Sequence, residues 1–384
     1  MSLPSKQSDH FSWHTGCRFT LLVDGEQYFP KMLAAINQAR DFILLEFYLV
    51  ESGYITRRFI KALTRARQRG VSVYMLLDDY GSRFLEPLDR EVLLAQDINL
   101  VWYNPFDYLR FFRSLRRDHR KLLLVDGVKA FTGGTGLSDA FAPPFDSQQA
   151  WHEVMVQIEG PIVADWQQVF SHTWQTVTGR LPDLPACSRQ QHSSEQSGRL
   201  LISAGLSLQE IKRAVIKNVR HANQRIWFTT PYFVPSRKIR RALIRRARAG
   251  VDVRLLLPGP LSDHPWVSHA ARGFYHRLLR HGIRIFEYQP RFTHAKIGLC
   301  DDWCTIGSSN LDRWNQRWNL DANQEIDARD FAAQVAQLFE TDFAQSLEIT
   351  LDGWLARSRV QRLQEWLAAR LVMLIELVAR RYRK

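Results

Sequence analysis

The chain repeats itself at long range, and this repeat constrains the possible folds more than any other feature of the sequence. The segment "RQRGVSVYMLL" around Gly70 is answered by "RARAGVDVRLLL" around Gly250. In each copy a basic segment with helical periodicity ends at the glycine, as helices commonly do, and a β-rich run follows. The repeat therefore predicts two similar halves in which helices and strands alternate.

The same alternation extends to either side of these glycines. Helical periodicity runs into a strand pattern at residues 31–50 and 57–79, and again at 210–234 and 237–259. The two blocks are separated by residues 178–199, which are rich in Pro, Ser and Gln and poor in apolar side chains. Such a composition is typical of a linker or crossover loop.

We therefore predict an α/β fold of two similar lobes, residues 1–177 and 200–348, each a mixed sheet flanked by helices. A pseudo-twofold axis is expected to relate the lobes and to place the active site between them. Residues 349–384 carry apolar side chains at helical spacing among many arginines, which predicts a basic amphipathic C-terminal helix.

Composition bounds the class of protein and of partner. With 384 residues and 45% hydrophobic side chains the chain can bury large cores, and its 52 Lys and Arg against 39 Asp and Glu favour a polyanionic partner. The cysteines have neither disulfide-framework nor metal-site spacing; they are Cys17, Cys187, Cys300 and Cys304. No signal peptide and no apolar run of about 20 residues is present, so any membrane association is expected to be peripheral.

Two short copies of one motif stand near the ends of the two halves. Residues 119–126 read "HRKLLLVD" and residues 294–301 read "HAKIGLCD", both H-x-K-x4-D. One copy alone is most simply a strand end whose long basic side chains reach water. The second copy favours a function, because His119 and Lys121 share one face of a strand, and His294 and Lys296 share the face of another.

The chemistry of these pairs favours phosphate over metal. A lysine on the same face repels a cation, and no carboxylate or second histidine is spaced to complete a ligand set. The small residues of "GGTG" at 133–136 and "GSSN" at 307–310 follow the motifs. They offer phosphate donors, namely Thr135, Ser308 and Asn310.

The aspartates that close the motifs are not expected to lie beside the histidine and lysine of the same motif. Asp126 lies an odd number of residues from His119 and Lys121, so it faces away from them or lies beyond the strand. The "DG" at 126–127 is a hairpin signal. We therefore expect Asp126 and Asp301 to hold turns, although both are kept in the candidate catalytic set because they complete the motif.

The duplicated H-x-K-x4-D followed by G-S/G-x-N resembles the phospholipase D superfamily. Over roughly residues 18–340 the chain is similar to bacterial cardiolipin synthases of the short type that lack N-terminal membrane spans. Further segments support this resemblance, among them "LLVDGEQYFPKML", "PYFVPS", "IRIFEY" and "GSSNLD".

The resemblance implies a phosphatidyltransferase that needs no metal or other cofactor. His119 would attack the phosphodiester to form a phosphohistidine, and His294 would act as general acid and base. Lys121 and Lys296 would hold the non-bridging phosphate oxygens. The family places an acidic residue after each motif to orient a histidine, here Glu153 and Asp321, and we expect each to serve the histidine of the opposite half. The alternative is that these two are ordinary strand-edge charges.

Three departures from the family pattern qualify this expectation. Gly136 stands where the first copy should have Asn, so that half-site loses a donor to phosphate. The second copy is one residue shorter between Asp301 and Gly307, which predicts a tighter hairpin. Asp321 is shorter by one methylene than the Glu of many relatives. The net charge of +13 permits a phosphodiesterase or nuclease as an alternative function, and Gly136 permits a catalytically impaired membrane- or nucleic-acid-binding protein.

The partners implied are phospholipids, with phosphatidylglycerol or phosphatidylethanolamine as donor, at the periphery of the bacterial inner membrane. Residues 106–118 interleave aromatic and basic side chains, which suits an anionic membrane surface and also single-stranded nucleic acid. The position of this segment beside the first motif favours lipid, and nucleic acid is the less expected partner. The C-terminal helix predicted at 349–384 fits either core packing or an in-plane membrane helix.

Overall fold

The computed structural model describes residues 11–107, 114–142, 150–185, 187, 194–205, 207–312 and 318–358, apart from the side chain of Trp266. Two predicted segments lie partly outside these residues. The structure does not describe 108–113 within the aromatic and basic segment, nor 359–384 within the predicted C-terminal helix. In the described part of the chain, no helix is long and apolar enough to cross a membrane.

The first half alternates strands and helices in the predicted order. Its elements are β1 (His14–Val23), α1 (Asp24–Gln38), β2 (Phe42–Phe47), α2 (Tyr54–Gln68), β3 (Ser72–Asp78), α3 (Pro87–Ala95), β4 (Asn99–Tyr103), β5 (Lys121–Val125), β6 (Lys129–Gly133), the 3₁₀ turn η2 (Asp139–Phe141), β7 (Val154–Glu159) and α5 (Val163–Thr178).

The second half repeats this order with additions. Its elements are β8 (Gln196–Ala204), β9 (Leu208–Gln209), α6 (Glu210–His221), β10 (Arg225–Thr229), α7 (Arg237–Arg248), β11 (Asp252–Pro258), α8 (Pro265–Arg272), α9 (Tyr275–Leu279), β12 (Arg284–Tyr288), β13 (Ile297–Cys300), β14 (Trp303–Gly307), β15 (Leu320–Asp327), α11 (Arg329–Ala344), β16 (Ser346–Ile349) and α12 (Leu351–Leu355).

The predicted glycine stops are present at equivalent places. Gly70 and Gly250 follow α2 and α7 with φ angles of 88° and 87°, a left-handed conformation that glycine adopts without steric cost. Each helix then leads directly into the next parallel strand, β3 or β11. The helix-to-strand boundaries read from the repeat are therefore confirmed.

Apart from β16 at one edge, the strand order is symmetrical about its centre, and it joins the two predicted sheets into one. From one edge it runs β16-β12-β11-β10-β13-β14-β15-β8, and it continues β1-β7-β6-β5-β2-β3-β4. Strands β2, β3 and β4 pair in parallel, as do β10, β11 and β12, and the other pairs are antiparallel. The junction is an irregular antiparallel pairing of β1 with β8, so the mixed sheets of the two halves are continuous.

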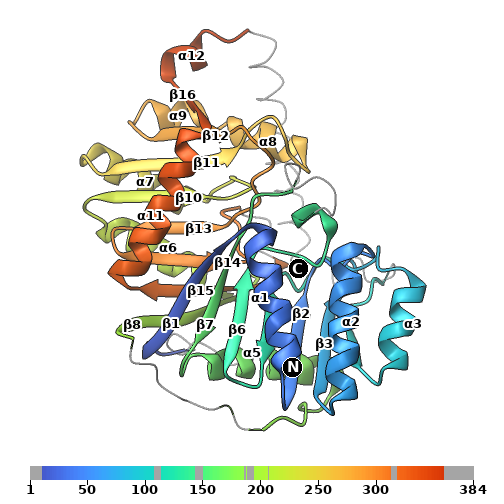
Figure 1. The fold of residues 1–384 in the computed structure, drawn as a ribbon. Coiled ribbons are helices and arrows are strands. Elements are labelled where there is room, and N and C mark those ends of the chain that lie inside the picture. Colours follow the sequence, from blue (N-terminus) through green and yellow to red (C-terminus); the bar gives the residue numbers. More distant parts are fainter. Residues whose placement is uncertain are drawn as a thin grey trace.

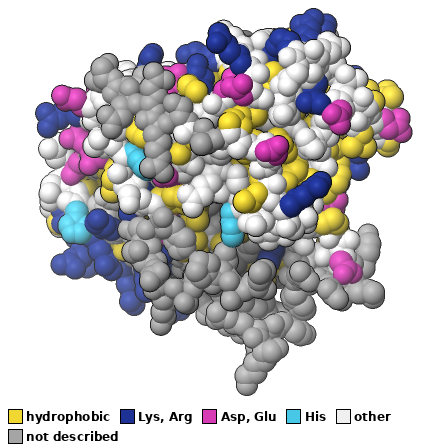
Figure 2. All heavy atoms as spheres, turned by 90° about the horizontal axis from the view of Figure 1, so that it is seen from below, with side chains coloured by type: hydrophobic (Ala, Val, Ile, Leu, Met, Phe, Trp, Pro, Cys, Tyr) yellow, Lys and Arg dark blue, Asp and Glu magenta, His cyan; other side chains and the backbone are white. Residues whose placement is uncertain are grey.

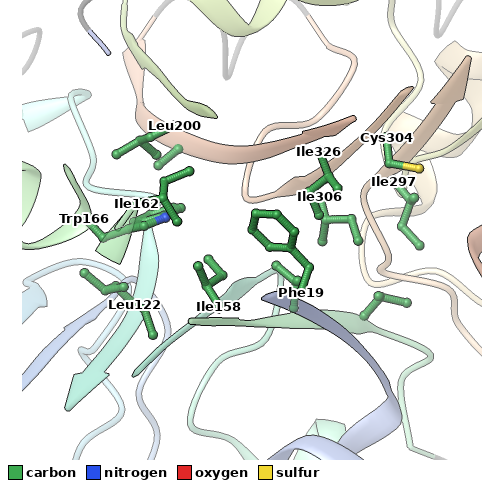
Figure 3. Close-up of a cluster of buried hydrophobic side chains, with 14 of the residues drawn as sticks. Phe19, Leu122, Ile158, Ile162, Trp166, Leu200, Ile297, Cys304, Ile306 and Ile326 are labelled. Carbon is green, nitrogen blue, oxygen red and sulfur yellow. The ribbon is translucent and has the colours of Figure 1, made fainter. Parts of the chain in front are cut away.

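Helices cover both halves, and a core shared by them lies in the middle (Figure 1). Side chains of α1 and α2 form an outer core with the first half's sheet, and those of α6, α7 and α9 form another with the second half's sheet. The central core holds residues of α5 and α11 together with both sheets. Figure 3 shows Phe19 and Ile158 of the first half close to Ile306 and Ile326 of the second.

Two predicted boundaries differ slightly from the structure. Residues 196–199, assigned to the linker from their polar composition, form the start of β8, because their polar side chains have partners in neighbouring elements. Arg199 Nε lies 2.7 Å from Glu325 Oε2, and Gln196 Nε2 donates to Asp330 Oδ2 at 2.7 Å. Ile349, assigned to the C-terminal helix, instead ends β16, which pairs with β12.

The aspartates that close the two motifs perform the same structural task. Asp126 accepts backbone N–H bonds from Arg40, Asp41 and Phe42, each at 2.9 Å, at the entry to β2. Asp301 accepts the equivalent bonds at the entry to β10, from Asn223, Gln224 and Arg225 at 2.7–3.0 Å. Both aspartates have positive φ, at 53° and 52°. They tie each motif strand to its neighbour, as the turn-holding expectation required.

The hairpins that these aspartates begin differ in length. Residues 126–128 separate β5 from β6, with Asp126 and Gly127 both at positive φ, whereas only 301–302 separate β13 from β14. The tighter second hairpin predicted from the spacing is confirmed.

We predict that Asp126→Asn and Asp301→Asn each lower the free energy of unfolding by about 2 kcal/mol, because charge-assisted bonds to three backbone amides are weakened. Asparagine tolerates the positive φ, so backbone strain is not added. Urea denaturation measures the change. Turnover per folded molecule should stay within about threefold of the wild type, and its abolition in a folded variant would show that the carboxylate has a direct catalytic task.

Candidate active site

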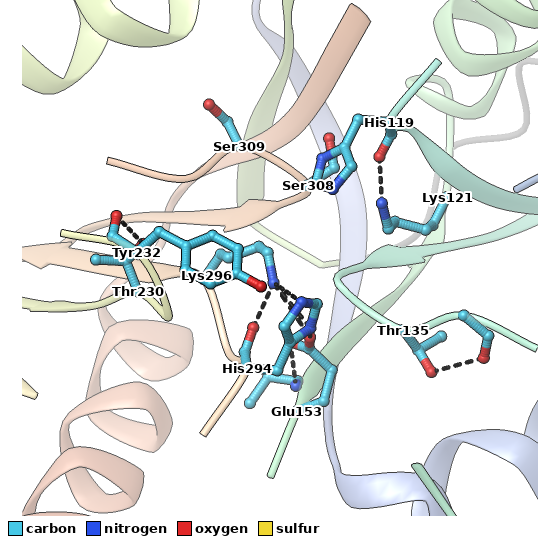
Figure 4. Close-up of polar contacts among 12 residues, drawn as sticks. His119, Lys121, Thr135, Glu153, Thr230, Tyr232, His294, Lys296, Ser308 and Ser309 are labelled. Carbon is cyan, nitrogen blue, oxygen red and sulfur yellow. Dashed lines mark hydrogen bonds and ion pairs between the residues drawn. The ribbon is translucent and has the colours of Figure 1, made fainter. Parts of the chain in front are cut away.

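The two motif pairs lie in one buried site between the halves. His119 and Lys121 stand at the start of β5, and His294 and Lys296 stand just before β13. All four are buried, with His119 and His294 each 9% exposed. Figure 4 shows both pairs in one close-up, approaching from strands of opposite halves.

Backbone hydrogen bonds between the halves hold each histidine in the same way. His119 N donates to Leu320 O at 2.9 Å, and His294 N donates to His152 O at 2.8 Å. Leu320 and His152 each precede one of the predicted orienting carboxylates, Asp321 and Glu153. The two contacts are related by the same pseudo-twofold symmetry as the strand order.

Each imidazole therefore meets a carboxylate of the opposite half, as expected from the sequence. His119 Nδ1 lies 3.0 Å from Asp321 Oδ1, and His294 Nδ1 lies 2.6 Å from Glu153 Oε2. A carboxylate at Nδ1 holds the proton there and leaves Nε2 free for chemistry. Both carboxylates are completely buried, so the bonds are shielded from water.

The lysines lie beside the imidazole rings. The negative charge around them is too small to keep their pKa values at the usual level. Lys121 Nζ donates to His119 O at 2.5 Å, and Lys296 Nζ lies 3.4 Å from Glu153 Oε2. Burial, and then the charge of Lys296, lower the pKa of Lys121 to about 7. Burial also lowers the pKa of Lys296. An anionic ligand bound between the two lysines would restore their charge, which makes the site suited to phosphate.

The ionisation of the histidines follows from the same surroundings. Burial, and then the charge of Lys121, lower the pKa of His119 to about 4, so its imidazole is neutral at neutral pH, as a nucleophile must be. Burial and Lys296 also lower the pKa of His294. Burial raises the pKa of Glu153 to about 7. Burial alone would raise the pKa of Asp321, but the hydrogen bonds from His119 and Ser308 hold it below its usual value.

Of the three predicted phosphate donors, Asn310 is the one whose side chain is unengaged. It is 1% exposed, and within the described part of the chain neither its amide nitrogen nor its oxygen has a hydrogen-bond partner. Ser308 Oγ donates to Asp321 Oδ1 at 2.8 Å, and Thr135 Oγ1 contacts Tyr28 Oη at 3.1 Å. A buried polar group without a partner is costly unless a ligand satisfies it, so Asn310 fits a phosphate oxygen best.

The described residues contain no group of three or more His, Cys, Asp or Glu side chains able to hold a metal ion.

Comparison with known proteins identifies this arrangement. A family model described as "Cardiolipin synthase, PLD-like domain" matches residues 32–174 and 215–343, one match for each half. The chain belongs to the cardiolipin synthase family. "Cardiolipin synthase A" of Pseudomonas putida (strain W619) is 33% identical over 351 residues, covering 89% of this chain and 72% of that protein. "Cardiolipin synthase A" of Pseudomonas aeruginosa (strain LESB58) is also 33% identical, covering 91% and 71%.

Solved structures of the same fold are more distant in sequence. Phosphatidylserine synthase from Haemophilus influenzae Rd KW20 superposes with a TM-score of 0.70 at 12% identity, covering 95% of this chain and 94% of that one. Polyphosphate kinase from Porphyromonas gingivalis has a TM-score of 0.59 at 14% identity, covering 87% and 49%. These likenesses confirm the predicted α/β fold of helix-flanked mixed sheets.

The structure explains why this family member lacks the Asn expected in its first motif. A Cβ atom at Gly136 would lie 2.8 Å from both the carbonyl oxygen and the Cβ atom of Leu49. A side chain there would have to push the backbone after β2 aside. The first half-site therefore has no room for the amide that Asn310 supplies in the second.

The two orienting carboxylates of this family member differ in length, and the residue facing each one compensates. A Cβ atom at Gly134 would lie 2.2 Å from Glu153 Oε2, so the longer carboxylate requires glycine opposite it. The equivalent residue in the second half is Ser308, whose hydroxyl fills the space beside the shorter Asp321 and donates to it. The pair Glu153 and Gly134 and the pair Asp321 and Ser308 thus fill the equivalent space in the two halves in different ways.

The sequence did not predict two residues that lie next to the motif histidines, His152 and Tyr48. His152 Nδ1 lies 2.9 Å from Asp24 Oδ1, and its Nε2 lies 3.2 Å from Asp342 Oδ2. Although burial alone would lower it, the bonds to these carboxylates raise the pKa of His152 to about 10, so it is a buried cation behind His294. Tyr48 packs against the His119 ring, with centroids 5.0 Å apart. The motif "WHE" contained the signal for His152, but its two acidic partners are far away in sequence.

We predict that Gly134→Ser lowers kcat by about a hundredfold, because it displaces Glu153 from His294. Adding Glu153→Asp, which copies the Ser308–Asp321 pair, should raise kcat at least about tenfold above that of Gly134→Ser alone. Steady-state kinetics of the two single variants and the double variant measure this coupling. Ser308→Ala serves as the comparison in the other half. Additive losses in the double variant would contradict the proposed exchange of one pair for the other.

Proposed function

We propose that this protein transfers a phosphatidyl group from one phospholipid to a hydroxyl group of another, through a phosphohistidine at His119. The observation that carries the proposal is the pair of cross-half imidazole–carboxylate bonds, which brings two buried imidazoles and two lysines from opposite halves into one site. Membership of the cardiolipin synthase family supports a phospholipid substrate.

In the first half-reaction His119 Nε2 attacks the phosphorus, so that a P–N bond forms while the P–O bond to the leaving alcohol breaks. His294 donates the proton that the departing oxygen needs. The negative phosphodiester between Lys121 and Lys296 offsets the positive surroundings of His294, which favours its protonated form. Glu153 stabilises the resulting imidazolium.

In the second half-reaction the acceptor hydroxyl gives its proton to His294 and its oxygen attacks the phosphorus. The P–N bond then breaks and His119 is regenerated, held throughout by Asp321. Lys121, Lys296 and the unengaged amide of Asn310 bind the non-bridging oxygens, where charge develops in the transition state. Ser308 and Thr135 are better assigned to supporting Asp321 and Tyr28 than to phosphate.

The proposed substrates are phosphatidylglycerol, or phosphatidylethanolamine as donor, at the surface of the bacterial inner membrane. Helix α7 supports an anionic surface as partner, because most of its residues are basic, none is acidic, and several of the basic ones are exposed. On the face shown in Figure 2, Lys and Arg side chains gather at the margins of the molecule. Such clusters are attracted to anionic lipid headgroups.

We predict that the purified protein converts labelled phosphatidylglycerol vesicles, without added metal, into cardiolipin and glycerol. His119→Ala and His294→Ala should each reduce this turnover by at least about a thousandfold, because each removes one partner of the two-step transfer. His221→Ala, at an exposed histidine ending α6, is the matched control and should retain activity. Thin-layer chromatography of the products measures all four proteins.

The other products separate the alternative functions. Phosphatidic acid alone would show a hydrolase, and cleavage of single-stranded DNA in a parallel reaction would show a nuclease. No turnover of either substrate would show a binding protein. Retention of activity by either motif variant would refute the two-histidine mechanism.

A further inference from the structure

A carboxylate that lies outside both motifs faces the second half-site. Asp263 stands in the loop between β11 and α8, and its Oδ2 accepts a short hydrogen bond from the hydroxyl of Tyr232. Its other oxygen, Oδ1, is buried and has no hydrogen-bond partner among the residues that the structure describes. A buried carboxylate oxygen without a donor is costly, so it is suited to a ligand that supplies one.

Asp263 and Tyr232 belong to the His294 side of the site. Burial and Lys296 lower the pKa of His294, and the charge of Asp263 acts against that shift. Asp263 likewise opposes the lowering of the pKa of Lys296 that burial causes. Figure 4 shows the Tyr232 ring extending toward Lys296 and His294. The Tyr232–Asp263 pair therefore belongs to the side of the site that holds His294 and Lys296.

The equivalent loop of the first half, residues 79–86, carries Arg83 together with Asp79 and Glu86. Arg83 lies in the loop after β3, and the charges of Arg117 and Arg83 both act on Tyr48, the ring that packs against His119. Arg117 is paired with Asp78 at 3.3 Å, whereas Arg83 is exposed. The two half-sites thus differ in these loops, since the hydroxyl of Tyr232 on the His294 side donates to Asp263.

We propose that Asp263, held by Tyr232, is the subsite for the alcohol that enters and leaves beside His294, and that it accepts a hydrogen bond from a second hydroxyl of that alcohol. This inference rests on the proposed transfer reaction and names its acceptor class as a polyol headgroup. A carboxylate repels phosphate and accepts hydrogen bonds from hydroxyl groups. Asp263 is therefore suited to bind the alcohol and not the phosphate. A monohydric alcohol cannot make this contact.

The test uses the donor phosphatidyl-p-nitrophenol, whose leaving group has no second hydroxyl and no amine besides its reacting oxygen. Release of p-nitrophenol then reports the first half-reaction alone. Glycerol, 1-propanol and ethanolamine compete as acceptors, and the ratio of phosphatidylglycerol to phosphatidylpropanol reports the subsite. We expect the wild type to favour glycerol. Asp263→Asn should lower that ratio about tenfold or more while p-nitrophenol release stays within about threefold, since a hydrogen bond to a charged group is lost.

Tyr232→Phe, which frees the carboxylate without removing it, should lower the same ratio by a smaller factor. Asp302→Asn is the matched control, since this exposed carboxylate lies in the β13–β14 turn beside Arg329, and it should leave the ratio unchanged.

Each remaining outcome decides against the proposal in a different way. An unchanged ratio in Asp263→Asn, or equal losses of both transfer products together with p-nitrophenol release, would show that Asp263 does not select the acceptor. A wild-type preference for ethanolamine that Asp263→Asn abolishes would assign the oxygen to an ammonium group instead of a hydroxyl. Phosphatidic acid as the sole wild-type product with every acceptor would refute the transfer function itself.

Discussion

The hydrogen bonds that cross between the halves, from His119 to Asp321 and from His294 to Glu153, are the contacts on which the site depends. Neither half contains a complete pair, because each supplies one imidazole to the carboxylate of the other. The irregular antiparallel pairing of β1 with β8 and the shared central core hold the halves together. A shift of the halves by one ångström would separate both pairs at once, which is a distance that matters for hydrogen bonding.

The site departs from symmetry wherever its two histidines are proposed to have different tasks. The backbone bonds, the lysines and the turn-holding aspartates are equivalent in both halves. The carboxylate lengths, the residues that face them and the amide of Asn310 are not. The loop after β11 places Asp263 against Tyr232, whereas the loop after β3 contains Arg83, whose charge acts on Tyr48. The contacts that position the site residues are therefore symmetrical, whereas the surroundings of the two reacting nitrogens differ.

Much of this could be predicted from the sequence, because the repeat and the motifs are local patterns. Helix ends at Gly70 and Gly250, the shared face of His119 and Lys121, and the turns at Asp126 and Asp301 follow from residue spacing alone. The engagement of Thr135 with Tyr28, and of His152 with Asp24 and Asp342, depends on helices more than a hundred residues away. Residues 196–199 look like linker until the partners of Arg199 and Gln196 are known.

The complementary pairs Gly134 with Glu153 and Ser308 with Asp321 bear on how such a site can diversify. In an assembly of two identical chains every substitution occurs twice, so both half-sites would have to keep the same carboxylate and the same facing residue. Covalent fusion of the halves removes that restriction. One half can then exchange both members of its pair while the other stays fixed, which allows a nucleophile and a proton donor to evolve separately from a common ancestor.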